Sequence, residues 1–363
     1  MNYHSPVITD LSKQITISNT NIGHNNQCYV IAEAGSNHNR DLKTAIALID
    51  AAADAGCDAI KFQSFTGDDI ASKYQSELTK LPDEFVKWGK NLKELYKFCA
   101  LPDSFYEPLV EHAHKRDIHL FSSPFSEKAV DRLVSIGVPA LKIASFELVH
   151  LPLIQYAAST GIPLIMSTGM AGLGDIERAM DAATSAGATQ ISLMHCGSSY
   201  PLGPGGANLA AMDTLRQAFG VPVGYSDHTL GIGVPVAVAT LGGSLLEKHI
   251  TLSRSDDGPD HGFAIEPNEL KDMVGLMHDA QLAVGSPKKV RQPEEEDNAR
   301  RGRRSPFTID VMRAGDVLDL DKVKVVRPGV GLEPMFLELL LGKRVNRDIP
   351  ADHPLTWDDF IDS

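Results

Sequence analysis

The sequence predicts a (β/α)8 barrel followed by a small C-terminal α+β module. From residue 28 on, a short β-branched run, a turn and a helical stretch rich in Ala and Leu recur. Eight such units over about 260 residues match the size of this barrel. Glycines follow several helical patterns as C-caps do, at Gly56, Gly137, Gly161 and Gly187. A doubly wound open sheet is the alternative, but the chain has no Gly-rich dinucleotide fingerprint.

The predicted strands share one pattern, an apolar start and a polar end. In chain order they are 29–35, 59–65, 118–124, 141–147, 163–169, 191–197, 221–228 and 244–250. Helix-period segments such as 42–56 and 125–137 lie between them. The carboxyl ends of barrel strands converge on one mouth, where active sites are built. The polar strand ends therefore predict a functional site there.

The character of the chain changes after residue 285. Segment 286–304 carries two prolines, a block of acids and a block of arginines, which indicates a linker. We interpret its Arg cluster, 300–304, as a solvated face. Residues 305–363 begin with alternating apolar and polar residues and form the predicted C-terminal module, while 1–285 hold an N-terminal extension and the barrel. About 60 residues bury a thin core, so we expect the module to dock.

Length and composition limit the classes of function. The chain has 363 residues, of which 43% are apolar, enough for a large domain and a smaller one. A net charge of −13 argues against nucleic acid as a partner, and an anionic substrate would need a local positive pocket. The four cysteines form no C-x-x-C pair, which predicts a reduced, cytoplasmic protein. We predict no signal peptide and, without a run of about 18 apolar residues, no membrane span.

Two histidines end neighbouring predicted strands, at His228 and His249. Imidazoles in these positions can approach closely enough to share one divalent metal ion, with Mn, Co and Mg as candidates. The alternative is that each histidine caps its strand and hydrogen-bonds a loop.

Two lysines, Lys61 and Lys142, end other predicted strands. They could bind a phosphate or carboxylate or form a Schiff base, and the alternative is an interior ion pair with Glu33 or Glu147. Two lysines at one mouth of an acidic protein favour an anionic ligand.

Further candidates lie at the same strand ends or in the loops that follow. Hydroxyl donors to the ligand are Ser145, Tyr200 and Ser226, which could also satisfy only local backbone. Acid/base or hydroxyl-binding candidates are Glu33, Glu147 and Asp260, with structural carboxylates as the alternative. Cys196 follows His195, but neighbours on a strand point to opposite faces, so we interpret Cys196 as a packing residue.

The ordered motifs resemble those of the sialic acid synthase family, from about residue 28 to the C-terminus. They are YVIAEAGSNHN, FSSPFS, LKIASFE, STGM, HCGSSYP, GYSDHT and LEKHIT. Members of this family condense phosphoenolpyruvate with an amino sugar to give a nine-carbon 2-keto acid. The tail VRPGVGLEPMFLELLLGKR is similar to the family's antifreeze-like (SAF) domain, which reaches over the barrel mouth of the partner in a homodimer.

The resemblance assigns roles to the matching positions. It implies that His228 and His249 hold the metal. It implies phosphoenolpyruvate binding by Lys61, Lys142, Ser145, Tyr200 and Ser226. It implies sugar contacts by Glu33, Gln63, Asp260 and, across the dimer, Arg327. Glu147 is the implied acid/base residue, with Glu33 as a second catalytic candidate.

The sequence departs from the family pattern at Arg40 and Gly197, where Gly and Thr are usual, and Ser123 stands where the sialate branch often has Thr. KIASFE and the tail resemble the pseudaminic acid synthase branch, whereas the neuraminate branch reads K-I-G-S-G-E. Phe146 would then suit a deoxygenated sugar, 2,4-diacetamido-2,4,6-trideoxy-altrose. The alternative product is N-acetylneuraminate or legionaminate, from N-acetylmannosamine or a related sugar.

Two other classes of function compete with a metal-dependent synthase. One is a Schiff-base aldolase that uses Lys61, Lys142 or Lys248 on the same barrel. The other is a non-catalytic protein whose tail recognises carbohydrate or ice. The number of polar strand ends at one mouth weighs against this last interpretation.

Overall fold

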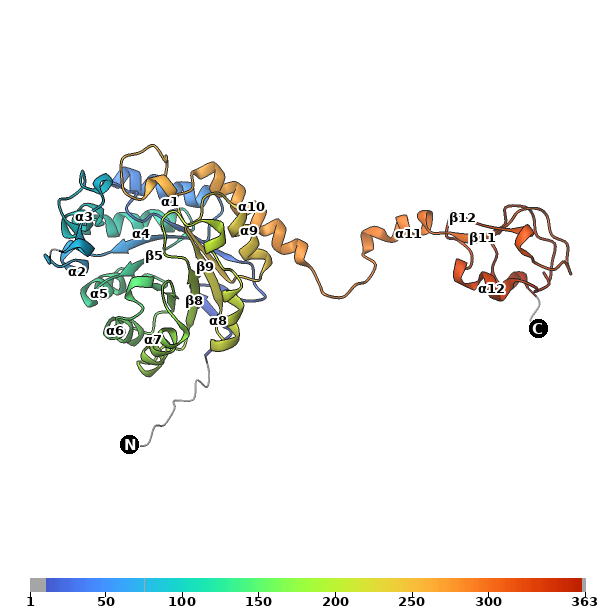
Figure 1. Cartoon of the computed structure of the whole chain (residues 1–363), viewed down its shortest axis with the longest axis horizontal. Coiled ribbons are helices and arrows are strands. Elements are labelled where there is room, and N and C mark those ends of the chain that lie inside the picture. The colour runs from blue at the N-terminus through green and yellow to red at the C-terminus, as the bar shows by residue number, and fades with distance from the viewer. Residues whose placement is uncertain (1–10, 75, 361–363) are drawn as a thin grey trace, which may run out of the picture. The chain divides into compact units, whose positions relative to one another are not determined.

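The computed structural model describes residues 11–74 and 76–360. The chain divides into two compact units, with the boundary in the sequence between Gly285 and Ser286. In Figure 1 the first unit is a barrel of strands enclosed by helices. The second unit is smaller and is described separately below.

Eight parallel strands close the barrel, in the order β10-β3-β4-β5-β6-β7-β8-β9. Their bounds are β3 Tyr29–Glu33, β4 Ala59–Ser64, β5 His119–Pro124, β6 Leu141–Ile143, β7 Leu164–Ser167, β8 Ile191–Cys196, β9 Val223–Asp227 and β10 Leu245–His249. The predicted (β/α)8 barrel is confirmed, and each observed strand lies within its predicted segment. The largest difference is in the fourth: β6 ends at Ile143, and Ser145–Glu147 form a 3-10 turn in which Glu147 N donates to Ala144 O.

Helices cover the outside of the barrel. They are α1 Leu42–Asp54, α2 Gly67–Ile70, α3 Leu92–Cys99, α4 Tyr106–Lys115, α5 Glu127–Ser135, α6 Leu151–Ser159, α7 Leu173–Ser185, α8 Ala211–Phe219, α9 Gly233–Thr240 and α10 Pro267–Val284. In α1 the Asp41 side chain caps the helix by accepting from Lys43 N and Thr44 N. The helix then buries Ala45, Leu48, Ile49 and Ala52, which share one face. None of the described helices is both long enough and apolar enough to span a membrane.

A β-hairpin precedes the barrel. The sequence predicted only an N-terminal extension here, with no structure assigned to it. The hairpin pairs β1 Gln14–Ile17 with β2 Thr20–Gly23, and its isoleucines join the core of the barrel unit. Thr16 N donates to the side chain of Gln190, the residue just before β8. The hairpin therefore contacts the amino-terminal end of a barrel strand, the end opposite to the predicted mouth.

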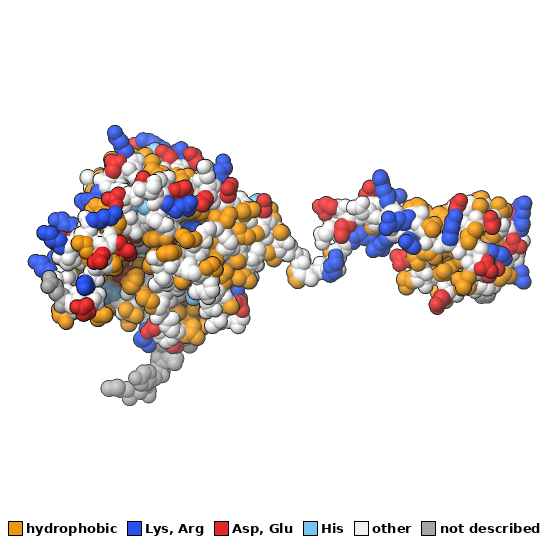
Figure 2. Space-filling model, turned by 45° about the horizontal axis from the view of Figure 1, so that its top comes forward, with side chains coloured by type: hydrophobic (Ala, Val, Ile, Leu, Met, Phe, Trp, Pro, Cys, Tyr) orange, Lys and Arg blue, Asp and Glu red, His pale blue; other side chains and the backbone are white. Residues whose placement is uncertain are grey.

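The second unit has a core of its own. It contains α11 Glu296–Gly302, β11 Ser305–Thr308, β12 Val323–Val326 and α12 Leu337–Leu340, with β11 and β12 antiparallel. The buried residues of this apolar cluster are Met312, Leu318, Val323, Leu340, Val345, Ile349, Leu355 and Phe360. The arginines at 300, 301, 303 and 304 are exposed, as expected of a solvated face, and basic side chains gather around α11 in Figure 2. Helix α11 lies within the segment that we predicted to be a linker.

Candidate active site

A cavity of about 670 Å³ lies at the carboxyl ends of the barrel strands. It brings together most of the residues that the sequence singled out. These are Glu33, Lys61, Gln63, Lys142, Ser145, Glu147, Tyr200, Ser226, His228, His249 and Asp260. Arg327 lies on the second unit, just after β12, and is exposed.

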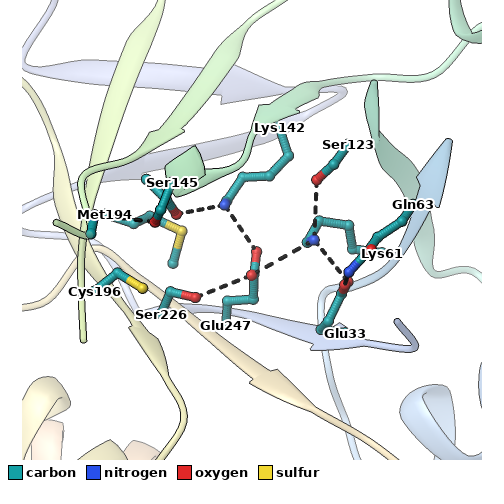
Figure 3. Close-up of polar contacts among 12 residues, drawn as sticks. Glu33, Lys61, Gln63, Ser123, Lys142, Ser145, Met194, Cys196, Ser226 and Glu247 are labelled. Carbon is teal, nitrogen blue, oxygen red and sulfur yellow. Dashed lines mark hydrogen bonds and ion pairs between the residues drawn. The ribbon is translucent and has the colours of Figure 1, made fainter. Parts of the chain in front are cut away.

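Two buried lysines and two buried carboxylates form a charged cluster in this cavity (Figure 3). Lys61 Nζ lies 2.8 Å from Glu33 Oε2 and 3.7 Å from Glu247 Oε1. Lys142 Nζ lies 3.6 Å from Glu247 Oε2, and the Ser226 hydroxyl donates to Glu247 Oε1 at 3.2 Å. The interior ion pair of Lys61 with Glu33, which the sequence left open, is therefore present. Both lysines also line the cavity, so the pair does not remove them from a ligand's reach.

The two lysines have different electrostatic surroundings. Burial lowers the pKa of Lys61, but Glu247 and Glu33 raise it more, so the net pKa shift is upward. For Lys142 burial dominates and the pKa lies below its usual value. An anion placed beside Lys142 would favour its charged form.

Three cavity residues that contact the two lysines were absent from the predicted site set. Ser123 accepts a hydrogen bond from Lys61 Nζ at 3.2 Å, and Ser167 accepts one from Lys142 Nζ at 2.6 Å. Glu247 lies between the two lysines. All three occupy polar strand ends, so the pattern indicated their position, but only the register of neighbouring strands reveals the lysine contacts.

His228 and His249 lie side by side, with ring centroids 5.5 Å apart. His228 Nδ1 lies 2.9 Å from the carbonyl oxygen of Gly197, which orients the ring and leaves Nε2 for another partner. His249 Nδ1 is buried and has no hydrogen-bond partner among the described residues. A buried imidazole nitrogen without a partner is chemically suited to a metal ion.

The protonation state of the two imidazoles decides whether they can bind a metal ion. Burial lowers the pKa of His249 well below its usual value, so the ring is neutral and able to ligate. Burial also lowers the pKa of His228, but Cys196, the Gly197 carbonyl and Glu247 together raise it above its usual value. Within residues 11–74 and 76–360, no three His, Cys, Asp or Glu side chains are grouped to hold a metal. The pair therefore fits an ion whose other positions are open to water or substrate, as in catalytic sites.

Glu147 is the cavity carboxyl with the clearest acid/base character. Burial raises its pKa to about 7, an effect that a backbone hydrogen bond and Lys142 only partly offset. A carboxyl with this pKa is poised to exchange a proton near neutral pH. The preceding Phe146 lies on the same 3-10 turn, lines the cavity and is 60% exposed.

The remaining candidates lie on the loop side of the cavity. Asp260 Oδ2 accepts from the backbone N and the hydroxyl of Ser36. Gly35 has φ +51°, and a Cβ there would lie 3.0 Å from Asp260 Oδ2 and 3.3 Å from His249 Nδ1, so glycine permits this close approach. The Tyr200 ring packs against His228, with centroids 4.2 Å apart.

Two neighbours on β8 point to opposite faces, as predicted. His195 Nε2 bonds the carbonyl oxygen of Ala207 and does not line the cavity. Cys196, which we predicted to be a packing residue, is buried but lines the cavity, with Sγ 3.9 Å from His228 Nδ1. Lys248 does not line the cavity, which removes it as a Schiff-base candidate there.

The departures at positions 40 and 197 have local structural explanations. Arg40 has φ +55°, a conformation that favours glycine, and its guanidinium donates to the carbonyl oxygens of Lys97 and Ala100. A Cβ at Gly197 would lie 2.4 Å from the Leu202 side chain. Gly197 thus allows Leu202 to pack closely beside the loop that orients His228.

Comparisons with known proteins agree with this fold. The NeuB family model matches residues 48–289, and a SAF domain model matches residues 312–361. The N,N'-diacetyllegionaminic acid synthase of Legionella pneumophila is 35% identical and covers 93% of this chain and 95% of its own. The pseudaminic acid synthase of Helicobacter pylori is 36% identical and covers 91% of this chain and 97% of its own.

Among solved structures, the N-acetylneuraminic acid synthetase of Leptospira borgpetersenii, in complex with citrate, is 33% identical. It superposes with a TM-score of 0.71 and covers 80% of this chain and 96% of its own. Similarity of this extent, together with the family match over most of the barrel, identifies the family. The chain belongs to the NeuB family and carries a C-terminal SAF domain.

Proposed function

We propose that the protein condenses phosphoenolpyruvate with an amino sugar and water, giving a nine-carbon 2-keto acid and phosphate. The observation that carries this proposal is the shared cavity, which holds two buried lysines and a pair of adjacent buried histidines. Relatives that match nearly the whole chain are named as synthases of pseudaminic and legionaminic acids.

Phosphoenolpyruvate binds at Lys61 and Lys142 in this proposal. Both ammonium groups are buried and line the cavity, which gives an acidic protein a local site for an anion. Hydroxyls nearby add hydrogen-bond donors to the carboxylate or phosphate. We assign this role to Ser145, Tyr200 and Ser226.

A divalent ion would be held by His228 and His249, with Mn, Mg or Co as candidates. When bound, it would act as a Lewis acid on the aldehyde oxygen of the open-chain sugar. The chain's own contribution is to orient the two rings, through the Gly197 carbonyl for His228 and through burial for His249.

In this proposal the sugar lies beside Glu33, Gln63 and Asp260. Gln63 Nε2 donates to Glu33 Oε1 at 2.7 Å, which leaves the carboxyl oriented and the Gln carbonyl oxygen available. Glu147, with its pKa near 7, supplies the proton that the aldehyde oxygen gains as the carbon–carbon bond forms. Glu33 is the second catalytic candidate.

We assign 2,4-diacetamido-2,4,6-trideoxy-altrose as the sugar and pseudaminic acid as the product. Named relatives of both the pseudaminic and the legionaminic type are about equally similar to this chain, so this choice depends on the cavity. Phe146 presents a large apolar surface in the cavity beside Glu147. A deoxygenated, acylated sugar gains more binding free energy from contact with this surface than a hydroxyl-rich sugar does.

The SAF domain completes the site in our proposal by serving a second copy of the chain. Arg327 would donate directed hydrogen bonds to an acylamino oxygen of the sugar bound by the partner. The functional unit is then a homodimer.

The experiment is an assay of phosphate release from phosphoenolpyruvate with Mn²⁺ and each candidate sugar in turn. We expect release with the trideoxy-altrose and much less with N-acetylmannosamine. EDTA should stop the reaction, whereas a Schiff-base aldolase would continue and be trapped by borohydride. Absence of phosphate release with every amino sugar would contradict the proposal.

A further inference from the structure

A second buried ion pair lies on the outer face of the barrel wall, outside the charged cluster of the cavity. Lys248 Nζ lies 2.6 Å from Asp227 Oδ2, and both side chains are at most 3% exposed. The two residues are register partners on β10 and β9. Each is the immediate neighbour of a cavity histidine, Lys248 of His249 and Asp227 of His228.

The pair also binds the residue on the other side of His228. Asp227 Oδ1 accepts from Thr229 N at 3.0 Å and from Thr229 Oγ1 at 2.8 Å. Lys248 Nζ donates to the Thr229 carbonyl oxygen at 2.7 Å. The backbone before and after His228 is thereby tied to the residue that precedes His249.

Alternation along β9 and β10 explains which side chains face the cavity and which face outward. Ser226, His228, Glu247 and His249 line the cavity, while Asp227 and Lys248 do not. Outward barrel positions normally carry apolar side chains that pack against the helices, and Leu246, two residues before Lys248 on β10, is a buried apolar residue at such a position. A buried ion pair adds little net stability over an apolar pair of similar volume, so stability alone does not account for it.

We propose that Asp227, Lys248 and Thr229 form a clamp that fixes the distance and orientation of His228 relative to His249. The three are positioning residues, because none of them lines the cavity and they act only through the two imidazoles. This inference rests on the proposed function, in which those imidazoles hold a divalent ion. Outer residues that orient metal ligands change metal affinity by about 10- to 100-fold when they are replaced.

The test measures Mn²⁺ binding to the metal-free, full-length protein by titration calorimetry, without substrates. Lys248→Met and Asp227→Asn should each weaken Mn²⁺ binding at least about tenfold. Lys248→Arg, which keeps a cation and donors, should recover most of the affinity. Thr229→Val removes one hydrogen bond and should give a smaller loss.

The matched control is Tyr29→Phe, at the opposite end of the strands. It removes a partly buried hydrogen bond, since Tyr29 OH lies 2.7 Å from His119 Nδ1. Tyr29→Phe should lower the melting temperature without changing Mn²⁺ affinity. A merely structural role of the clamp would produce the same result for Lys248→Met.

The outcomes separate this inference from the function on which it rests. Unchanged Mn²⁺ affinity in folded Lys248→Met and Asp227→Asn, with tight binding by the wild type, overturns the clamp and leaves the metal assignment standing. Failure of the wild-type protein to bind Mn²⁺ overturns both. If Lys248→Met does not fold, Thr229→Val decides, because it keeps the ion pair and loses a single hydroxyl contact.

Discussion

Lys61 Nζ lies 2.8 Å from Glu33 Oε2 in a contact that is almost completely shielded from water. With Glu247 and Lys142 the cluster holds two cations and two carboxylates, so its formal charge is zero. An anionic substrate must therefore compete with protein carboxylates for the lysines. This competition makes the roles of the four residues separable by experiment.

Lys142→Met should weaken phosphoenolpyruvate binding specifically. Lys142 is preferable to Lys61 because loss of Lys61 would leave Glu33 without its cation. We expect the KM for phosphoenolpyruvate to rise at least about tenfold, roughly 1.4 kcal/mol, with little change in the KM for the sugar. Lys43→Met, at an exposed position on α1, is the control. An unchanged KM for phosphoenolpyruvate would count against the assignment.

Glu247→Gln should have the opposite effect on phosphoenolpyruvate. The substitution keeps the shape and a hydrogen-bond acceptor for Ser226 but removes the negative charge between the two lysines. We expect the Kd for phosphoenolpyruvate to fall about three- to tenfold, because a competing charge is lost. Calorimetry without sugar measures this directly, with the exposed Glu111→Gln as control. Weaker binding would show that Glu247 assists the substrate instead.

His228→Ala and His249→Ala should each abolish turnover and leave the fold intact. Both rings lie together in the cavity, and loss of either would leave a metal ion with one imidazole. Phosphate release measures turnover, and circular dichroism checks the fold. The control is His195→Gln, because His195 is a neighbouring strand histidine that does not line the cavity. Full activity in either alanine variant, or in metal-stripped wild type, would refute the assignment.

Glu147 should impose a pH limit on the rate. Its pKa is raised to about 7, so the acid form predominates below that pH. If Glu147 donates a proton, kcat/KM falls as pH rises through about 7. Glu147→Gln should lower kcat about 10²- to 10⁴-fold and remove this limb. If the fall in kcat/KM above pH 7 persists in Glu147→Gln, it belongs to another group. If kcat/KM of the wild type instead rises through pH 7, Glu147 acts as a base.

The same pKa has a consequence for stability that is independent of turnover. Burial raises the pKa of Glu147 from 4.5, its ordinary value in the unfolded chain, to about 7 in the folded protein. The stabilisation due to its neutral form is complete below pH 4.5 and is lost as pH rises through 7. Glu147→Gln should therefore melt higher than the wild type above pH 7, with the difference shrinking toward pH 4.5. Thermal melts of both proteins across this pH range measure the difference.

The sequence predicted which strand ends meet, because the carboxyl ends of parallel barrel strands converge on one mouth. His228 and His249 were singled out by their positions at neighbouring strand ends, and alternation predicted the opposite directions of His195 and Cys196. The contacts across strands were not predictable, since they depend on register. The position of Glu247 between the lysines is such a case.

Local backbone geometry accounts for other differences. Glu147 was predicted at a strand end, but a 3-10 turn carries it, and only the structure shows that turn. The N-terminal hairpin was missed because it precedes the β/α repeat and each of its strands has only four residues. Residues 1–10 and 361–363 of the predicted extension and C-terminal module lie outside the described residues.

Removal of the C-terminal unit should spare the barrel and impair the reaction. The two units have separate apolar cores, so a chain that ends at Gly285 should fold. If Arg327 serves the sugar, the truncated chain loses activity chiefly through a higher KM for sugar, with the KM for phosphoenolpyruvate nearly unchanged. Steady-state kinetics with each substrate varied in turn measures this. Equal losses in both KM values would indicate general damage to the barrel.

Arg327→Ala in the full-length chain should reproduce much of that defect without a change in oligomeric state. Complementation then decides which barrel the arginine serves. An Arg327→Ala chain is mixed with a His249→Ala chain, and the assay is run at a sugar concentration well below KM. If Arg327 serves the partner, each mixed dimer has one site with both lesions and one intact site, so activity returns in part. If Arg327 serves its own barrel, every site keeps one lesion, and the mixture is no more active than its two parents.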